Sequence, residues 1–180
     1  MNKKGSSHHF IKVINIPVKP NILFKKLGVL GIKSDTIEHP AVFTAEEATK
    51  YCSDLPGAHC KTLFLKDKRG ELWLIISLDH RRLNMKKLQG LIGSARLSFG
   101  KPDLLLEILG VYPGSVTPFA LINDVNLRVK PVLDEGIIRS DVANFHPLIN
   151  TMTTTIKSSD LKLFIADCGH TLRIIDLDLA

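Results

Sequence analysis

Two apolar segments separated by a short polar stretch constrain the fold of this chain more than any other feature. Residues 61–66 and 71–78 are dominated by Leu, Ile, Phe and Trp, and Asp67-Lys68-Arg69-Gly70 lies between them. This spacing predicts a β-hairpin in which Gly70 takes the positive φ that a tight turn requires. Other predicted strands are also joined by short turns, which favours a largely antiparallel sheet.

Predicted helices and strands mix irregularly along the rest of the chain. Helices are expected at residues 20–30, 45–52, 84–91, 102–109 and 158–168, and strands at 36–39, 119–122, 127–133, 151–156 and 170–177. This order predicts an α+β (α/β) fold: a single compact domain with a mixed, largely antiparallel sheet flanked by helices. We place the domain at residues 20–180, after an N-terminal extension at residues 1–19.

Composition excludes several classes of protein and site. No apolar run approaches the roughly 18 residues that a membrane span needs, so we expect no membrane partner. The three cysteines, Cys52, Cys60 and Cys168, form no CxxC pair, which argues against a disulfide framework and a zinc site. A reducing cytoplasm fits this pattern. The chain also lacks a Walker A loop, a GxGxxG fingerprint and a GxSxG elbow.

The positive charge of the chain is concentrated in two blocks. The formal net charge is +6; residues 1–33 hold seven lysines and no acid, and residues 66–101 hold nine bases against three acids. Such blocks suit a phosphate-rich partner, although solubilising surface lysines would give the same counts. Charge alone therefore favours nucleic-acid binding only moderately.

Three positions have the chemistry of a site, each with an ordinary structural alternative. In Pro113-Gly114-Ser115-Val116-Thr117-Pro118, a glycine and a proline four residues apart fix a loop whose amides could surround an ester carbonyl, or an ordinary turn. Lys61 begins an apolar strand and could hold a phosphate or hydroxyl at a pocket edge, or simply be solvated. His146 lies before a proline among apolar residues, where a histidine is more often structural than catalytic.

Five motifs, in this order and spacing, resemble one family. They are Leu23–Leu30 with Gly31-Ile32 and Glu38–Ala48, then Leu55–Asp67, the Gly114–Pro118 loop, Phe145–Asn150, and Gly169-His170. Together they resemble the YbaK/ProX superfamily of aminoacyl-tRNA deacylases, and within it the freestanding prolyl-tRNA editing proteins of the ProXp-ala type. The resemblance covers about residues 20–178.

The resemblance implies hydrolysis of alanine wrongly esterified to proline tRNA. It implies catalytic roles for Lys61 at the terminal adenosine, for Gly114 in the loop around the ester and its water, and for His146 in the pocket wall. It implies substrate contacts from a further set of residues: Thr62, Ser115, Val116, Thr117, Pro118 and Asn150. Many relatives have asparagine where this chain has Thr62, which puts the contact with the adenosine in doubt.

Because the ester is already activated, positioned water and backbone donors could suffice, so we expect no metal and no other cofactor. The expected partner is the acceptor end of proline tRNA, with prolyl-tRNA synthetase or an elongation factor as transient partners. Two alternatives stay open: a deacylase of the same fold that acts on cysteine attached to proline tRNA, and a tRNA-binding module without catalysis.

Overall fold

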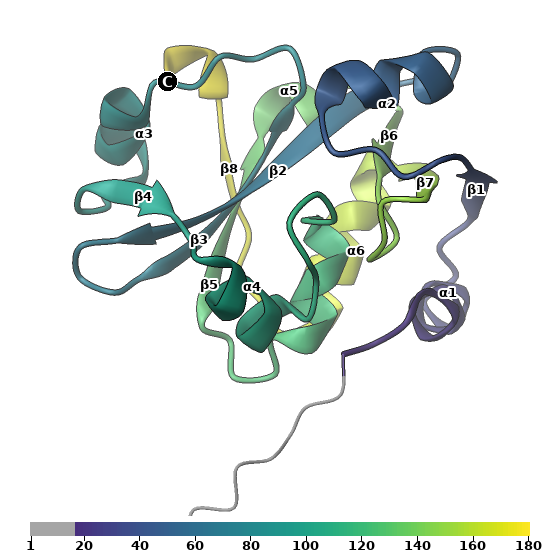
Figure 1. The fold of residues 1–180 in the computed structure, drawn as a ribbon, viewed down its shortest axis with the longest axis horizontal. Coiled ribbons are helices and arrows are strands. Elements are labelled where there is room, and N and C mark those ends of the chain that lie inside the picture. Colours follow the sequence, from purple (N-terminus) through teal and green to yellow (C-terminus); the bar gives the residue numbers. More distant parts are fainter. Residues whose placement is uncertain (1–16) are drawn as a thin grey trace, which may run out of the picture.

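The predicted hairpin lies at the centre of the sheet (Figure 1). The computed structural model describes residues 17–180. β2 (Ala58–Asp67) pairs antiparallel with β3 (Leu72–Leu78), so that Lys61 lies opposite Ser77. Gly70 has a φ of 88° in the connecting turn, as predicted. Alternation along β3 directs Leu74 and Trp73 to opposite faces, and each face buries its own apolar cluster.

The described residues form one eight-stranded mixed sheet in the order β1-β7-β6-β2-β3-β5-β8, with β4 paired to β2. The other strands are β1 (Ser34–Glu38), β4 (Leu97–Phe99), β5 (Val129–Asp134), β6 (Val142–Phe145), β7 (Met152–Lys157) and β8 (Arg173–Ile175). The pairs β2–β6, β3–β5 and β5–β8 are parallel, and the other four are antiparallel. The predicted fold class is therefore confirmed.

The two parts of the sheet join through a short contact. β2 and β6 share only the pairs Ala58–Ala143 and His59–Asn144. By contrast, β2 and β3 share seven pairs and β3 and β5 share five. A large part of the sheet (β2, β3, β5, β8 and β4) is thus connected to a smaller part (β1, β7 and β6) by two residue pairs.

Helices cover both faces of the sheet. They are α1 (Pro20–Val29), α2 (Ala45–Cys52), α3 (Met85–Ile92), α4 (Pro102–Leu109), α5 (Glu135–Ile138) and α6 (Ser158–Asp167), with the 3-10 helices η1 (Pro118–Asn123) and η2 (Leu177–Leu179). The larger core gathers around Phe119, whose ring meets those of Phe145 and Phe164 edge-on at 5.9 and 5.3 Å. α3 and η2 cover the other face, where Trp73 is buried.

One predicted strand is wrong and another is too long. Residues 119–122 form part of η1, because Pro118 occupies its first turn and Thr117 Oγ1 accepts from the amide of Phe119. Residues 118–121 are all buried, so their apolar run has no alternation that would distinguish helix from strand. The predicted strand at 170–177 is limited to β8, and its last residue begins η2.

Other differences concern short elements and the N-terminal boundary. β4, β6 and the four-residue helix α5 were not predicted. The amide of Val18 donates to Asn123 Oδ1 at 2.8 Å, so the chain contacts the domain within the predicted extension at 1–19. Residues 1–16 of that extension lie outside the described residues. In the part of the chain that the structure describes, every helix is too short or too polar to cross a bilayer.

Candidate active site

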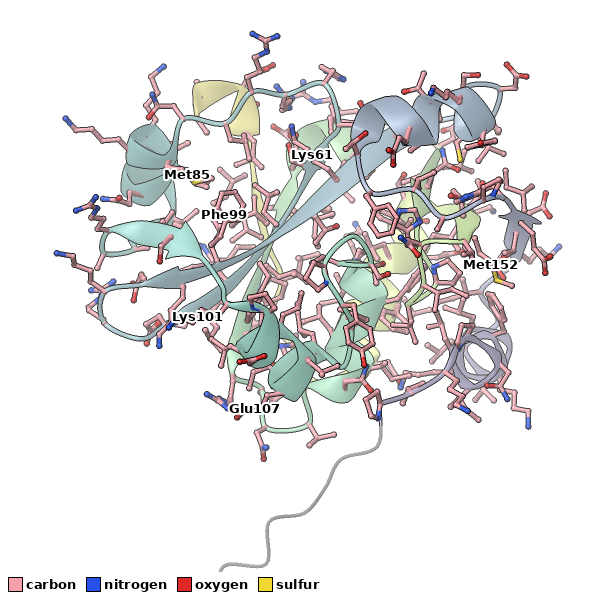
Figure 2. The ribbon with its side chains drawn as sticks, in the orientation of Figure 1. Lys61, Met85, Phe99, Lys101, Glu107 and Met152 are labelled. Atoms are coloured by element: carbon pink, nitrogen blue, oxygen red, sulfur yellow. The ribbon has the colours of Figure 1, made fainter. Side chains whose placement is uncertain are left out.

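A cavity of about 260 Å³ lies where β2, α2, β6 and the loop before η1 meet. Six residues predicted for the site line it: Lys61, Thr62, Gly114, Val116, Thr117 and His146. Its wall also contains small and apolar side chains from the segment around α2, including Val42, Phe43, Ala48 and Cys52. Figure 2 shows Lys61 at the end of β2 nearest α2.

Lys61 is fixed at the cavity by main-chain carbonyls. Its Nζ donates to the carbonyl of Asp79 at 2.9 Å and to that of Arg81. β2 begins at Ala58, so Lys61 is the fourth residue of the strand and not its first, as the sequence suggested. The ammonium nevertheless lies at the cavity, because the loop after β3 runs past the end of the hairpin.

A buried ion pair holds that loop in place. Arg81 Nε lies 2.5 Å from Oδ2 of Asp134, whose side chain is fully buried at the end of β5. The Arg81 guanidinium also pairs with Asp178, and its Nη2 lies 3.9 Å from Asp176. Asp134 additionally accepts from the amides of Leu78 and Gly136. The position of the Lys61 ammonium therefore depends on the carboxylate of Asp134, 73 residues later in the chain.

The Gly114 loop offers unused donors beside this ammonium. The amide of Ser115 closes the turn on the carbonyl of Tyr112 at 2.9 Å. The amides of Gly114, Val116 and Thr117 have no acceptor among residues 17–180, and these three residues line the cavity. Gly114 has a φ of 88°, a conformation that other residues rarely adopt. The loop can thus present several donors to one oxygen.

His146 is a neutral ring in this environment. Its Nδ1 lies 2.9 Å from the carbonyl of Met152, which can only accept, so Nδ1 carries the proton and Nε2 remains an acceptor. Burial lowers the pKa of His146 below its usual 6.5, the Met152 carbonyl opposes this effect, and His39 adds to it. The two histidine rings are 6.1 Å apart.

His39 belongs to a hydrogen-bonded chain along the wall. Its Nδ1 donates to the carbonyl of Pro40 at 2.8 Å, and its Nε2 is hydrogen-bonded to Thr153 Oγ1 at 2.9 Å. The Cys52 thiol is hydrogen-bonded to the same hydroxyl at 3.4 Å. The His39 ring stacks on Tyr51 with the centroids 6.0 Å apart. This chain connects α2 to β7 and fixes one side of the cavity.

Cys60 lines the cavity but is not a nucleophile. Burial raises the pKa of its thiol far above the usual range; a hydrogen bond with the Asn144 main chain lowers it in part, and the carboxylates of Asp79 and Asp134 raise it by smaller amounts. The thiolate is the reactive form of cysteine, so this group is inert at neutral pH. Across the described residues, His, Cys, Asp and Glu side chains nowhere gather in a group of three that could hold a metal ion.

Three predicted site residues lie outside the cavity lining. Ser115 and Pro118 are buried in the loop. Asn150 Nδ2 donates to the carbonyl of Val42 at 2.9 Å, while the amide of Val42 donates to the carbonyl of Asn150 at 3.1 Å. Asn150 therefore fixes the segment before α2, which forms one wall of the cavity. Direct contact of Ser115, Pro118 and Asn150 with substrate stays a prediction.

Several wall residues were not predicted as site residues, chiefly Thr153, Asn144 and Asp79. Asn144 is held on three sides: its Nδ2 donates to the carbonyls of Pro56 and Ala58, and its Oδ1 accepts from Thr155. Asn144 stands two residues before His146 in the sequence, and this position could have identified it as a residue of the cavity wall. Thr153 is 114 residues from His39 in sequence, and no local pattern indicates that contact.

Comparisons with known proteins place this architecture among editing domains. Residues 39–164 match the family described as the aminoacyl-tRNA editing domain. The chain is 37% identical over 161 residues to prolyl-tRNA synthetase associated domain-containing protein 1 of Mus musculus, covering 87% of this chain and 95% of that protein. It is 33% identical over 153 residues to the prolyl-tRNA editing protein ProX of Acetoanaerobium sticklandii, covering 84% and 93%.

A solved structure described as a candidate trans-editing enzyme for prolyl-tRNA synthetase has the same fold. Its TM-score is 0.66 at 22% identity, over 89% of this chain and 97% of that one.

Proposed function

Because this chain belongs to the aminoacyl-tRNA editing domain family, we propose that it is a trans-editing deacylase that hydrolyses the ester of alanine mischarged onto proline tRNA. The acceptor end of that tRNA would enter the cavity. Prolyl-tRNA synthetase or an elongation factor would be a transient partner, and the cytoplasm the compartment.

One observation carries the proposal: three residues whose amides have no acceptor among residues 17–180, a fixed ammonium and a neutral histidine line the same cavity. Amides aimed at the ester oxygen would stabilise the negative charge that develops when water attacks the carbonyl carbon. His146 Nε2 would hold the attacking water as a hydrogen-bond acceptor. The ester C–O bond then breaks, and the proton lost by the water goes to the departing ribose hydroxyl.

Lys61 would act on the nucleotide and not on the reacting atoms. Its ammonium is held at the cavity edge by the carbonyls of Asp79 and Arg81, so its charge is fixed where the terminal adenosine would arrive. Thr62 is the next residue of β2 and also lines the cavity. A hydroxyl there can still donate and accept one hydrogen bond each, which would replace part of the contact expected from an amide.

The size of the cavity supports alanine as the substrate. A side chain bound there would have to fit beside Val42, Phe43 and Cys52, which line the cavity together with the loop before η1. A pocket of this kind rejects a larger side chain by steric clash, whereas a missing methyl costs only about 1 kcal/mol of contact.

The decisive experiment measures deacylation of proline tRNA charged separately with alanine, cysteine, serine and proline. We expect release of alanine at the highest rate and protection of proline. Faster release of cysteine would assign the chain to the cysteine-specific alternative. Saturable tRNA binding without release of any amino acid would favour the binding module.

A further inference from the structure

A second cavity, of about 420 Å³, lies at the far end of the β2–β3 hairpin. Three cationic side chains line it, Arg69, Lys130 and Arg173, against one carboxylate, that of Glu71. They come from the hairpin turn, β5 and β8, which are distant in sequence. The proposed deacylation uses none of them.

Trp73 forms the floor of this second cavity. Only 3% of the residue is exposed, and the Lys130 ammonium lies 5.2 Å from the centroid of its ring. Within residues 17–180 its indole Nε1 has no hydrogen-bond acceptor. The Lys130 ammonium over this ring, with Arg69 and Arg173 at the same cavity and only one carboxylate in its lining, points to an anionic ligand.

The cations are held in fixed positions by the end of α3. Arg69 Nη2 donates to the carbonyl of Gly93 at 2.9 Å, and Arg173 Nη1 donates to that of Ile92 at 2.7 Å. These bonds cap the C-terminus of α3, but they use only some of the five N–H donors of each guanidinium. Arg69 and Arg173 are both exposed, so their other donors remain for a ligand. Lys130 is held in turn by Glu71.

The second cavity and Lys61 are on the same face of the hairpin. Lys61 pairs with Ser77 and Leu65 pairs with Trp73, four residues along each strand, so alternation puts Lys61 and Trp73 on one side. α3 covers this side (Figure 2, Met85 at its start) and ends at the second cavity. At about 3.3 Å per residue, Lys61 and the end of β2 are about 20 Å apart.

From these contacts we propose that the second cavity binds a backbone phosphate of the RNA whose 3′ end occupies the editing cavity. This inference rests on the proposed function for the identity of the RNA. The acceptor arm of a tRNA carries phosphates continuously over a distance of about 20 Å, since a nucleic-acid strand has one charge per roughly 3.4 Å of helix axis. Arg82, in the loop after β3, and Lys86 and Lys87, in the first turn of α3, add three exposed cations to the segment that leads from Arg81 to the second cavity.

Trp73 provides a direct probe, because it is the single tryptophan of the chain. The experiment titrates the wild-type protein, Lys130→Gln and Arg173→Gln with uncharged proline tRNA, with its acceptor-stem minihelix and with inorganic pyrophosphate. Tryptophan fluorescence and the salt dependence of Kd are recorded. Lys162→Gln, on the exposed side of α6, is the matched control. Thermal unfolding of each variant shows that it is folded.

We expect both RNAs to change the fluorescence of the wild type. Each cavity variant should bind the minihelix about five- to tenfold more weakly and lose about 0.7–0.9 from the log–log salt slope, as for one lost phosphate contact. Release of alanine from an aminoacylated CCA trinucleotide, too short to reach the second cavity, should stay unchanged in these variants.

Equal Kd values and salt slopes for wild type, both variants and Lys162→Gln would overturn the inference. Saturable binding of pyrophosphate that RNA does not displace would also overturn the inference, because the ligand of the second cavity would then be a free phosphate compound. Failure of the proposed function can be distinguished from failure of this inference. If the proposed function is wrong, the wild type will not release alanine from the trinucleotide, but the RNA titrations will still measure binding at the second cavity.

Discussion

Arg81 donates from Nε to the buried carboxylate of Asp134 at 2.5 Å, and the carbonyl of the same arginine accepts a hydrogen bond from Lys61. One residue therefore transmits the position of a buried carboxylate to the ammonium at the editing cavity. We regard Asp134 and Arg81 as positioning residues for Lys61.

Asp134→Asn should lower deacylation about 10- to 100-fold, because a displacement of about 1 Å at a reacting group has an effect of this size. Removing one charge from a buried pair should also destabilise the fold, by about 3 kcal/mol or more. A double-mutant cycle with Lys61→Ala separates these effects. In the Lys61→Ala background, Asp134→Asn should change deacylation little further, and additive losses would contradict a positioning role.

Lys61→Ala should reduce kcat/KM for alanyl-tRNA by about 10²-fold while the protein stays folded, because in the proposed mechanism the ammonium binds the terminal nucleotide and lies at the cavity, outside the apolar core. Deacylation and thermal unfolding are measured on the same preparation, with Lys162→Ala as the control for loss of one exposed lysine. Unchanged turnover would identify Lys61 as an ordinary surface residue.

Gly114→Ala should reduce both stability and turnover. A Cβ at Gly114 would lie 3.0 Å from Cδ1 of Phe43, and its φ of 88° strains any other residue. We expect a stability loss of about 1 kcal/mol or more, and a loss of turnover of about 10²-fold if the loop amides hold the ester oxygen. Gly31→Ala is the control, since Gly31 has a φ of 70° in open space. Equal activities of the two folded variants would remove the loop from the active site.

The pH dependence of stability should report His146. Its folded-state pKa lies below 6.5, mainly because of burial, so the unfolded chain binds the proton more readily. The stability that the neutral ring contributes is present above pH 6.5 and decreases as the pH falls below that value. The slope is at most about 1.4 kcal/mol per pH unit for one proton. Urea denaturation of wild type and His146→Asn should show a shallower slope for the variant, and parallel curves would be contrary to this assignment.

Cys60→Ala should keep deacylation within about threefold of the wild type, because a thiol whose pKa is raised by burial supplies almost no thiolate at neutral pH. Iodoacetamide should likewise leave Cys60 of the native protein unmodified at pH 7, as mass spectrometry of tryptic peptides can establish. Rapid alkylation at Cys60 with parallel loss of activity would restore a thiol mechanism.

The sequence was informative where a local pattern fixes a local structure. The β2–β3 hairpin, the turn at Gly70 and the helix at residues 45–52 were predicted correctly. The family resemblance, drawn from five ordered motifs, is confirmed. η1 was missed because residues 118–121 are all buried, so their apolar run does not alternate.

The site was predictable only in part. Lys61, Gly114 and His146 could be identified from motifs, and the structure brings them to one cavity, although their roles stay predictions. The roles of Asp134 and Thr153 depend on contacts across 53 and 114 residues of sequence. Such contacts follow from how strands pair, which single-sequence patterns do not specify.

The two-pair contact between β2 and β6 has a consequence for substrate selection. His59 and Asn144, which form one of the pairs, both line the editing cavity, so the cavity straddles the seam between the two parts of the sheet. Asn144 also connects the two parts through its side chain, because its Nδ2 donates to the carbonyls of Pro56 and Ala58. On the proposed function, a change at Asn144 would raise the upper size limit for the amino acid without altering any group at the ester, so the selection of substrate would depend on how the two parts of the sheet are held together.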